Sequence, residues 1–523
     1  MLSQAITDIP TIRDHGRANA VLVGLALAYL LLEWVPGFVG PYGYFIDEFY
    51  YVACSNHLAL GYVDHPPLSI LLLRLIRAGL GDSLPALRLI PSLLGGATVL
   101  ATGLLARRLG ANVFGQAIAA GAVMVGSIYQ ITFGYYSMNA LSILLWTLCF
   151  WILVEIERRN EPRLWLVFGA LAGLALENKH TFVLLLLGLA IGMALTRARR
   201  HWGDRWLWFG CAVALALFLP NLLWQAGHDW PSLEFYRNAD VYKNVPTPPL
   251  EVLKQQVLFM NPSALPIWLA GLVFFLVTVR GRPFRHLGWI YVVLLLLMLL
   301  GQKSRPDRIA DAYTSLFAGG GVLLGELSQR PRLRWLRLAL PATLVAFGAA
   351  LTPLALPLLP PQTTSNYAAA LRIVPQIEKG EGKRSELPQW LADRFGWEEL
   401  VNDVEAVARE IDPAERDRAV ILAPSYGQAG AIELLGRGRD LPPVYATQNS
   451  CFHWGPPADP VDVAIVVGPV DEEEVRQLFN DVELAGVHDC EWCMPWRDEV
   501  PIWLARGQRV LFRDAWPQMK HYE

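Results

Sequence analysis

Long apolar runs separated by short polar loops fill the chain from about Ala18 to Leu359. A helix that crosses a bilayer needs about 20 mostly apolar residues. By this measure about eleven segments are candidate spans, and they are centred near residues 29, 95, 123, 146, 169, 187, 214, 271, 293, 318 and 347. The segments near 169 and 187 are short, because the polar run Glu177-Asn178-Lys179-His180 interrupts them. The pattern predicts an α-helical polytopic membrane protein.

After the last apolar run the pattern changes at the Pro-rich stretch around residues 357–365. We therefore expect a membrane domain over residues 1–360 and a separate domain over residues 361–523. In the second part, short apolar strands alternate with helical patterns, which is typical of a small α/β domain. The expected strands are 418–423, 443–446, 461–468 and 502–505, and the expected helices are 398–411, 427–435 and 472–479.

The distribution of Lys and Arg gives the expected orientation, since these residues are enriched in cytoplasmic loops. With the N-terminus in the cytoplasm, every second loop carries an arginine cluster, and the first span is a retained signal anchor. These clusters lie near residues 107, 158, 197, 280 and 330. An odd number of spans then places the C-terminal domain outside the cytoplasm. We expect a multi-pass protein of the inner (plasma) membrane.

Composition agrees with lipid-exposed surface. Charged residues make up 17% of the chain, whereas a soluble domain usually carries about 25%. The net charge of −3 is too small to indicate a nucleic-acid partner.

The first long outer loop, about residues 40–86, carries two groups of chemically active residues. Asp47 and Glu48 stand side by side among aromatic residues that include Tyr50. A carboxylate that is partly desolvated near the membrane surface is a better base, although a solvated acidic pair at a helix end has the same pattern. Further on, Asp64-His65 precedes Pro66-Pro67, which stiffens the entry to a helix; an ordinary turn is the alternative.

This loop resembles the first outer loop of the GT-C glycosyltransferases, in the family of protein O-mannosyltransferases and lipid A aminoarabinose transferases (family 39-like). The resemblance continues in order along the chain and covers most of residues 40–320. It is carried by Asp47-Glu48, by Gly-Tyr-Val-Asp-His-Pro-Pro at 61–67, by Glu177–Thr181, by Pro220–Gln225 with His228–Pro231, by Asn261-Pro262 with Leu265–Trp268, and by Lys303–Tyr313.

The resemblance implies an inverting glycosyltransferase that moves a sugar from a polyprenyl-phosphate donor to an extracytoplasmic protein, lipid or glycan. It implies that Asp47 is the base and that Glu48 supports it. Fixed cations would stabilise the leaving phosphate, and the candidates are Lys179, Lys303, Arg305 and Arg308. Tyr50, Asp64, His65 and His228 are the expected substrate contacts. His65 and His180 depart from the residues that several members carry, which puts a phosphate contact at His65 in doubt.

No cofactor is expected. His57, His65 and His228 with Glu48 leave a divalent metal possible, but their spacing matches no metal-binding motif. Cys490 and Cys493 favour a structural disulfide if their domain lies in an oxidising compartment. The aromatic run Asn449–Pro457 is either a structural loop or a contact for the acceptor.

The competing class is a multi-pass transporter or lipid flippase. Transporters place ionisable residues at mid-membrane and commonly contain repeated halves. Here the candidate residues lie in outer loops and no repeat is evident, which favours the enzyme.

Overall fold

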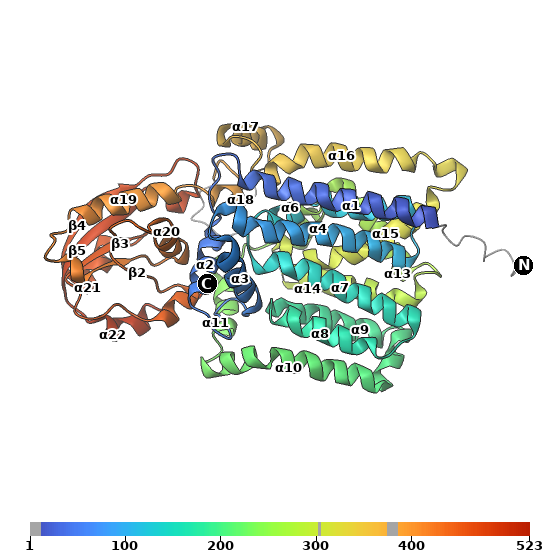
Figure 1. The fold of residues 1–523 in the computed structure, drawn as a ribbon, viewed down its shortest axis with the longest axis horizontal. Coiled ribbons are helices and arrows are strands. Elements are labelled where there is room, and N and C mark those ends of the chain that lie inside the picture. The colour runs from blue at the N-terminus through green and yellow to red at the C-terminus, as the bar shows by residue number, and fades with distance from the viewer. Residues whose placement is uncertain (1–11, 302–304, 374–384) are drawn as a thin grey trace, which may run out of the picture.

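The computed structural model describes residues 12–301, 305–373 and 385–523, and it consists of a helical bundle with a smaller α/β domain at one end (Figure 1). Among the described residues, six helices of the bundle are long and apolar enough to cross a membrane. They are α1 (Ile12–Trp34), α4 (Leu84–Leu109), α7 (Met138–Arg159), α10 (Arg205–Gly227), α14 (Arg285–Gly301) and α16 (Leu336–Ala355). The chain is therefore a multi-pass membrane protein.

Three further spans are bent pairs of helices, which raises the number of candidate spans to nine. The bends measure 64°, 106° and 92°. The pairs are α5 (Val113–Val125) with α6 (Ser127–Phe133), α9 (Val183–Ala194, preceded by the 3-10 helix η2, His180–Phe182) with the 3-10 helix η3 (Arg197–Gly203), and α12 (Pro249–Phe259) with α13 (Leu265–Leu276).

The eleven predicted centres all lie within helices. Two of them, near residues 169 and 318, fall in α8 (Leu164–Leu176) and α15 (Tyr313–Leu327), which have 13 and 15 residues. Helices of this length are too short to cross a bilayer alone. By length and composition the described residues thus contain six to nine spans rather than about eleven, because the sequence pattern does not show where a helix bends or stops short.

Small residues allow the central helices of the bundle to pack closely. A Cβ atom on Gly320 of α15 would collide with the carbonyl oxygen of Ile267 in α13, and a Cβ atom on Gly115 of α5 would collide with that of Gly321. Small residues at helix contacts are common in membrane proteins because they let backbones approach. This packing fixes the positions of the loops at the end of the bundle next to the C-terminal domain (Figure 1). We call it the outer end, because the charge pattern predicts that it lies outside the cytoplasm.

The C-terminal domain contains one five-stranded sheet with the order β2-β1-β3-β5-β4. β2, β1 and β3 run parallel to one another, and β5 runs antiparallel to both of its neighbours, β3 and β4. The strands are β1 (Ala419–Leu422), β2 (Val444–Tyr445), β3 (Val463–Val467), β4 (Phe479–His488) and β5 (Val500–Gln508). The main helices are α18 (Gln389–Ala392), α19 (Trp397–Arg409), α20 (Tyr426–Leu435), α21 (Glu472–Leu478) and α22 (Phe512–Ala515).

The four predicted strands and three predicted helices of this domain are confirmed, whereas β4 was not predicted. The domain boundary at residue 360 stays a prediction. α17 (Pro361–Leu371) follows it directly.

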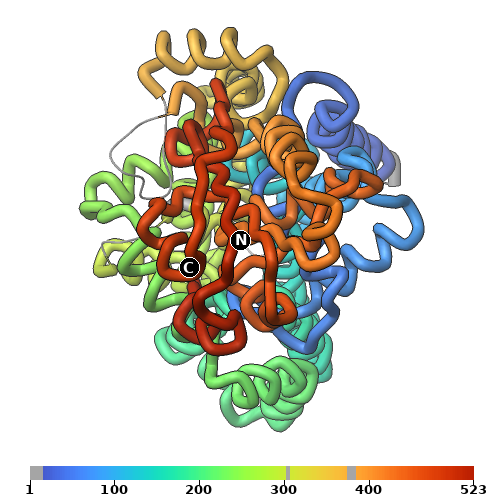
Figure 2. The backbone as a smooth tube through the Cα atoms, turned by 90° about the vertical axis from the view of Figure 1, so that its left-hand side faces the viewer, coloured from blue at the N-terminus to red at the C-terminus, as the bar shows by residue number. Residues whose placement is uncertain are grey.

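Short outer helices connect the bundle to the C-terminal domain. They are α2 (Ile46–Asn56), α3 (Leu68–Leu80), α11 (Pro231–Asn238) and the π-helix η4 (Ala239–Lys243). Figure 2 shows the C-terminal sheet lying across this end of the bundle. Phe49 and Tyr50 of α2 belong to the same buried cluster as Trp397, Ile421 and Ile465 of the C-terminal domain. The first outer loop and the C-terminal domain therefore share one hydrophobic core.

Candidate active site

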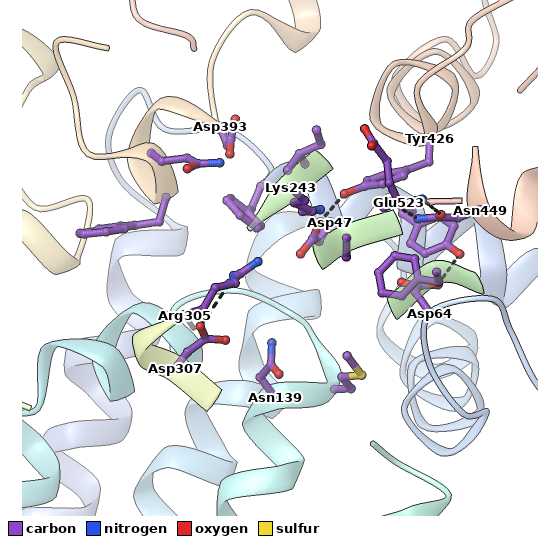
Figure 3. A pocket seen from close by; sticks show the side chains of 18 of the residues that line it. Asp47, Asp64, Asn139, Lys243, Arg305, Asp307, Asp393, Tyr426, Asn449 and Glu523 are labelled. Carbon is purple, nitrogen blue, oxygen red and sulfur yellow. Dashed lines mark hydrogen bonds and ion pairs between the residues drawn. The ribbon is translucent and has the colours of Figure 1, made fainter. Parts of the chain in front are cut away.

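A cavity of about 250 Å³ lies between the outer end of the bundle and the C-terminal domain. We call it the outer pocket. Figure 3 shows its polar side chains converging from several elements. Six of the predicted site residues line it, namely Asp47, Tyr50, Asp64, Lys179, Arg305 and Arg308. Residues that lie far apart in the sequence thus meet at one place.

Asp47 lies in the first turn of α2, where a negative charge is favoured by the exposed N–H groups of the helix end. The hydroxyl of Tyr426 donates to Asp47 Oδ1 over 3.0 Å. Tyr426 is the first residue of α20, so the C-terminal domain holds this carboxylate in place. Asp47 is half-buried and faces the outer pocket.

The second carboxylate of the outer pocket is Asp64. Its Oδ1 accepts a hydrogen bond of 2.7 Å from the hydroxyl of Tyr50, and the same hydroxyl lies 2.8 Å from Ser450 Oγ. Burial raises the pKa of Tyr50 well above its usual value, and the charge of Asp64 raises it further. Tyr50 therefore stays protonated and orients Asp64.

Glu48 does not face the outer pocket, contrary to the predicted supporting role. Its carboxylate is fully buried and forms an ion pair of 3.0 Å with Arg88 of α4. It also accepts backbone N–H groups from Phe45 at 2.8 Å and Tyr136 at 3.0 Å. With its oxygens occupied by these partners, Glu48 anchors the start of α2 to the bundle.

Basic residues also line the outer pocket. Lys179 directly precedes η2. Arg305 directly precedes the 3-10 helix η7 (Pro306–Ala312), and Arg308 lies within it. Arg305 Nε lies 3.2 Å from Asp307 Oδ1 (Figure 3). Burial acts to raise the pKa of Asp307, but the positive charges of Arg305, Lys179 and Arg308 outweigh it and lower that pKa. The same charges are placed to bind an anionic group of a ligand. Lys303, the fourth predicted cation, lies outside the described residues.

Two predicted substrate contacts lie elsewhere. His65 is fully buried, and its ring stacks on Tyr51 with 4.9 Å between the ring centroids. His228 is exposed and stacks on Trp224 at 4.2 Å. Neither residue lines the outer pocket. The sequence shows that both lie in outer loops but not which way their rings turn.

Several residues of the outer pocket were missed from the sequence. Lys243 and Tyr236 come from η4 and α11, and Tyr426 and Asn449 come from the C-terminal domain. The run that begins at Asn449 was noted as a candidate for acceptor contact, and its first residue does reach the pocket. Tyr426 was not predicted as a site residue, because nothing in the sequence shows that it meets Asp47.

The structure gives no support for the two remaining chemical features considered. Among the described residues, no group of three or more His, Cys, Asp or Glu side chains is arranged to hold a metal ion. The expected disulfide is not formed, since Cys490 and Cys493 are free thiols. The Cys493 thiol donates instead to the Cys490 carbonyl oxygen over 3.1 Å.

Comparison with known proteins agrees with this picture. Residues 64–224 match the family described as dolichyl-phosphate-mannose-protein mannosyltransferase. Over 188 residues the chain is 28% identical to the lipid A galacturonosyltransferase RgtD of Rhizobium johnstonii. This match covers 36% of the chain and only 39% of that relative.

Solved structures share the whole architecture. ArnT from Cupriavidus metallidurans in the apo state superposes with a TM-score of 0.60 at 13% identity, covering 94% of this chain and 98% of that chain. The same protein bound to undecaprenyl phosphate gives a TM-score of 0.60 at 14% identity, covering 94% and 97%. The chain therefore has the GT-C fold, and its residues 64–224 are similar to the family described as dolichyl-phosphate-mannose-protein mannosyltransferase.

Proposed function

We propose that this protein is an inverting glycosyltransferase that moves a sugar from a polyprenyl-phosphate donor to an acceptor on the non-cytoplasmic side of the membrane. The observation that carries the proposal is the outer pocket itself. It brings Asp47 and Asp64 together with Lys179, Arg305 and Arg308 around one cavity at the end of a membrane bundle. A lipid-linked sugar phosphate presents the matching groups, an anionic phosphate and a neutral sugar.

The reaction is a single displacement. The acceptor hydroxyl attacks the anomeric carbon of the sugar while Asp47 takes the hydroxyl proton. The bond between the anomeric carbon and the phosphate oxygen breaks, and the electron pair leaves with the phosphate. Lys179, Arg305 and Arg308 stabilise the charge that develops there, because fixed cations in a water-poor site act strongly on a developing anion.

The donor proposal is supported by the structure of ArnT bound to undecaprenyl phosphate, which has the same fold. The acceptor that we propose is lipid A or a similar glycolipid, since the relative RgtD is a lipid A galacturonosyltransferase. The exposed apolar side chains of the nearby α12, Leu250, Leu253 and Leu258, would suit an acceptor that arrives within the outer leaflet.

A turnover assay in membranes tests the proposal. Membranes containing the full chain are given a panel of polyprenyl-phosphate sugars with lipid A, a Ser/Thr peptide or a polysaccharide as acceptor. We expect transfer to lipid A, and we expect Asp47→Asn to lower kcat by about 10²–10⁴-fold, the usual contribution of a positioned base. Glu251→Gln, which removes an exposed carboxylate of α12 that does not line the outer pocket, should leave turnover unchanged.

The outcomes separate the parts of the proposal. Equal turnover of the wild type and Asp47→Asn would remove Asp47 from the role of base. Transfer to the peptide or polysaccharide alone would replace the acceptor. Absence of transfer from every lipid-linked donor would contradict the proposed reaction. Repeating the assay with a metal chelator tests the expectation that no divalent metal is required.

A further inference from the structure

A second polar cavity lies at the end of the bundle opposite the outer pocket. It has a volume of about 530 Å³ and lies between the end of α9 and the start of α14. We call it the basic cavity. Its lining residues are Leu195, Thr196, Arg197, Arg199, Leu276, Arg282, Arg285 and Trp289.

Close helix packing builds the walls of the basic cavity. α9 and α14 meet through glycines, and a Cβ atom on Gly192 would lie 2.8 Å from the carbonyl oxygen of His286. The Thr196 side chain accepts the Ala198 N–H over 3.3 Å and so caps η3. These contacts hold η3, which carries Arg197 and Arg199, beside the residues around the start of α14, which include Arg282 and Arg285.

The four arginines of the basic cavity have no carboxylate partner. Within the described part of the chain, none of them forms an ion pair or a side-chain hydrogen bond, and Arg285 Nε is buried without an acceptor. Among the described residues the exposed Arg332 and Arg334 are likewise unpaired, but five other arginines at this end of the bundle are neutralised. Glu155 pairs with Arg108, Arg158 and Arg159, Glu157 pairs with Arg200, and Glu326 pairs with Arg280.

Arg197, Arg199 and Arg282 are exposed, so water weakens but does not abolish the repulsion among the four like charges. The buried Arg285 N–H group without an acceptor destabilises the protein. An anion in the cavity would remove both costs. Phosphate suits this site best, because the planar guanidinium group binds phosphate oxygens through paired hydrogen bonds.

The apolar rim of the basic cavity indicates a lipid rather than a soluble anion. Leu195 is 58% exposed and Val277, next to Leu276, is 70% exposed. Trp289 also lines the cavity, and tryptophan favours the membrane–water interface. Acyl chains could therefore lie against these side chains while the headgroup enters the cavity. Basic pockets between spanning helices are known to bind anionic lipid headgroups.

We propose that the basic cavity binds the phosphate headgroup of an anionic phospholipid, in the leaflet opposite the outer pocket. This site is separate from the proposed transfer reaction and stands whether or not that reaction is confirmed.

Lipid retention by the purified full chain tests the proposal. Delipidated protein in detergent is incubated with phosphatidylglycerol or phosphatidylcholine, and retained lipids are counted by native mass spectrometry. We expect the wild type to retain phosphatidylglycerol preferentially. Arg282→Gln/Arg285→Gln should reduce this preference roughly tenfold. The matched control Arg332→Gln/Arg334→Gln removes two exposed arginines from the 3-10 helix η8 (Pro331–Leu333) and its flank, outside the cavity, and should keep the preference.

Three results would overturn the proposal. They are equal retention of the two lipids by the wild type, an equal loss in the control variant, and displacement of the lipid by inorganic phosphate at comparable concentration, which would indicate a soluble-anion site. Thermal unfolding verifies that each variant is folded. If Arg282→Gln/Arg285→Gln does not fold, Arg197→Gln/Arg199→Gln on the exposed wall replaces it, with the same expected loss.

Discussion

Two adjacent carboxylates at the start of α2 have opposite surroundings. Asp47 faces the outer pocket and accepts from Tyr426, whereas Glu48 is enclosed by Arg88 and two backbone N–H groups. The sequence predicts that a carboxylate of this pair is chemically important, but it does not show which one turns inward. That choice depends on Arg88, which lies 40 residues further along the chain.

The buried pair of Glu48 and Arg88 leads to a prediction about stability. Arg88→Ala leaves the Glu48 carboxylate buried without its counter-charge, and breaking such a pair costs about 3–5 kcal/mol. Thermal unfolding of the detergent-solubilised full chain should show a marked decrease in melting temperature. Arg74→Ala, at an exposed position of α3, serves as the control and should change stability by less than about 0.5 kcal/mol. Equal melting temperatures for Arg88→Ala and Arg74→Ala would refute the anchoring role.

Glu177, just before Lys179, leads to a prediction about pH. Burial raises its pKa from 4.5 to about 7, a shift partly offset by a backbone hydrogen bond from Asn221. The folded state therefore favours the protonated form, so the wild type loses stability as pH rises from the unfolded value of 4.5 to about 7. Glu177→Gln, which stays neutral, should raise the melting temperature at pH 8 and leave it nearly unchanged at pH 4.5.

The control for this pH series is Glu251→Gln, which removes an exposed carboxylate. Its effect on melting temperature should be small and independent of pH. If Glu177→Gln behaved in the same way, the carboxyl group of Glu177 would be solvated rather than buried.

At the scale of elements, the contact between α2 and α20 determines the shape of the outer pocket. Gly430 of α20 lies against the backbone of Phe49, where a Cβ atom would come within 2.9 Å of the carbonyl oxygen. Gly430→Leu should push α20 away and separate Tyr426 from Asp47. We expect lower kcat and faster proteolysis between the membrane and C-terminal parts. Gly203→Leu, at a position with no neighbouring atom within 4 Å, should have little effect on either measurement.

The elements also show how far the sequence pattern is informative. Runs of about 20 apolar residues locate helices well, but the bend at Gly126 between α5 and α6 leaves no gap in the apolar run. β4 was missed because its exposed positions include Asn480, Asp481 and Glu483 and do not alternate regularly with buried ones, so its first residue was assigned to the preceding helix. The sequence predicted the residues of the outer pocket that come from the loops of the bundle, but not those from the C-terminal domain. Tyr426 meets Asp47 across 379 positions of the chain, and no local pattern encodes that contact.

At the scale of the whole molecule, the proposed orientation can be tested by labelling. Lys254 in α12 is exposed near the outer pocket, and Arg334 is exposed near the opposite end of the bundle. In intact cells, a membrane-impermeant maleimide should label Lys254→Cys but not Arg334→Cys. The wild type gives the background, because five of its six cysteines are buried and the exposed one, Cys211, lies in the spanning helix α10. Labelling of Arg334→Cys alone would invert the topology and place the outer pocket in the cytosol.

The shared core of α2 and the C-terminal domain has a consequence for protein engineering. Chimaeras that exchange only the C-terminal domain between relatives would pair a foreign α20 with the native α2, so that Tyr426 and Gly430 no longer match Asp47 and Phe49. Grafts that carry residues 46–56 together with the domain preserve this fit. The natural unit for transplanting the C-terminal domain is therefore discontinuous in the chain.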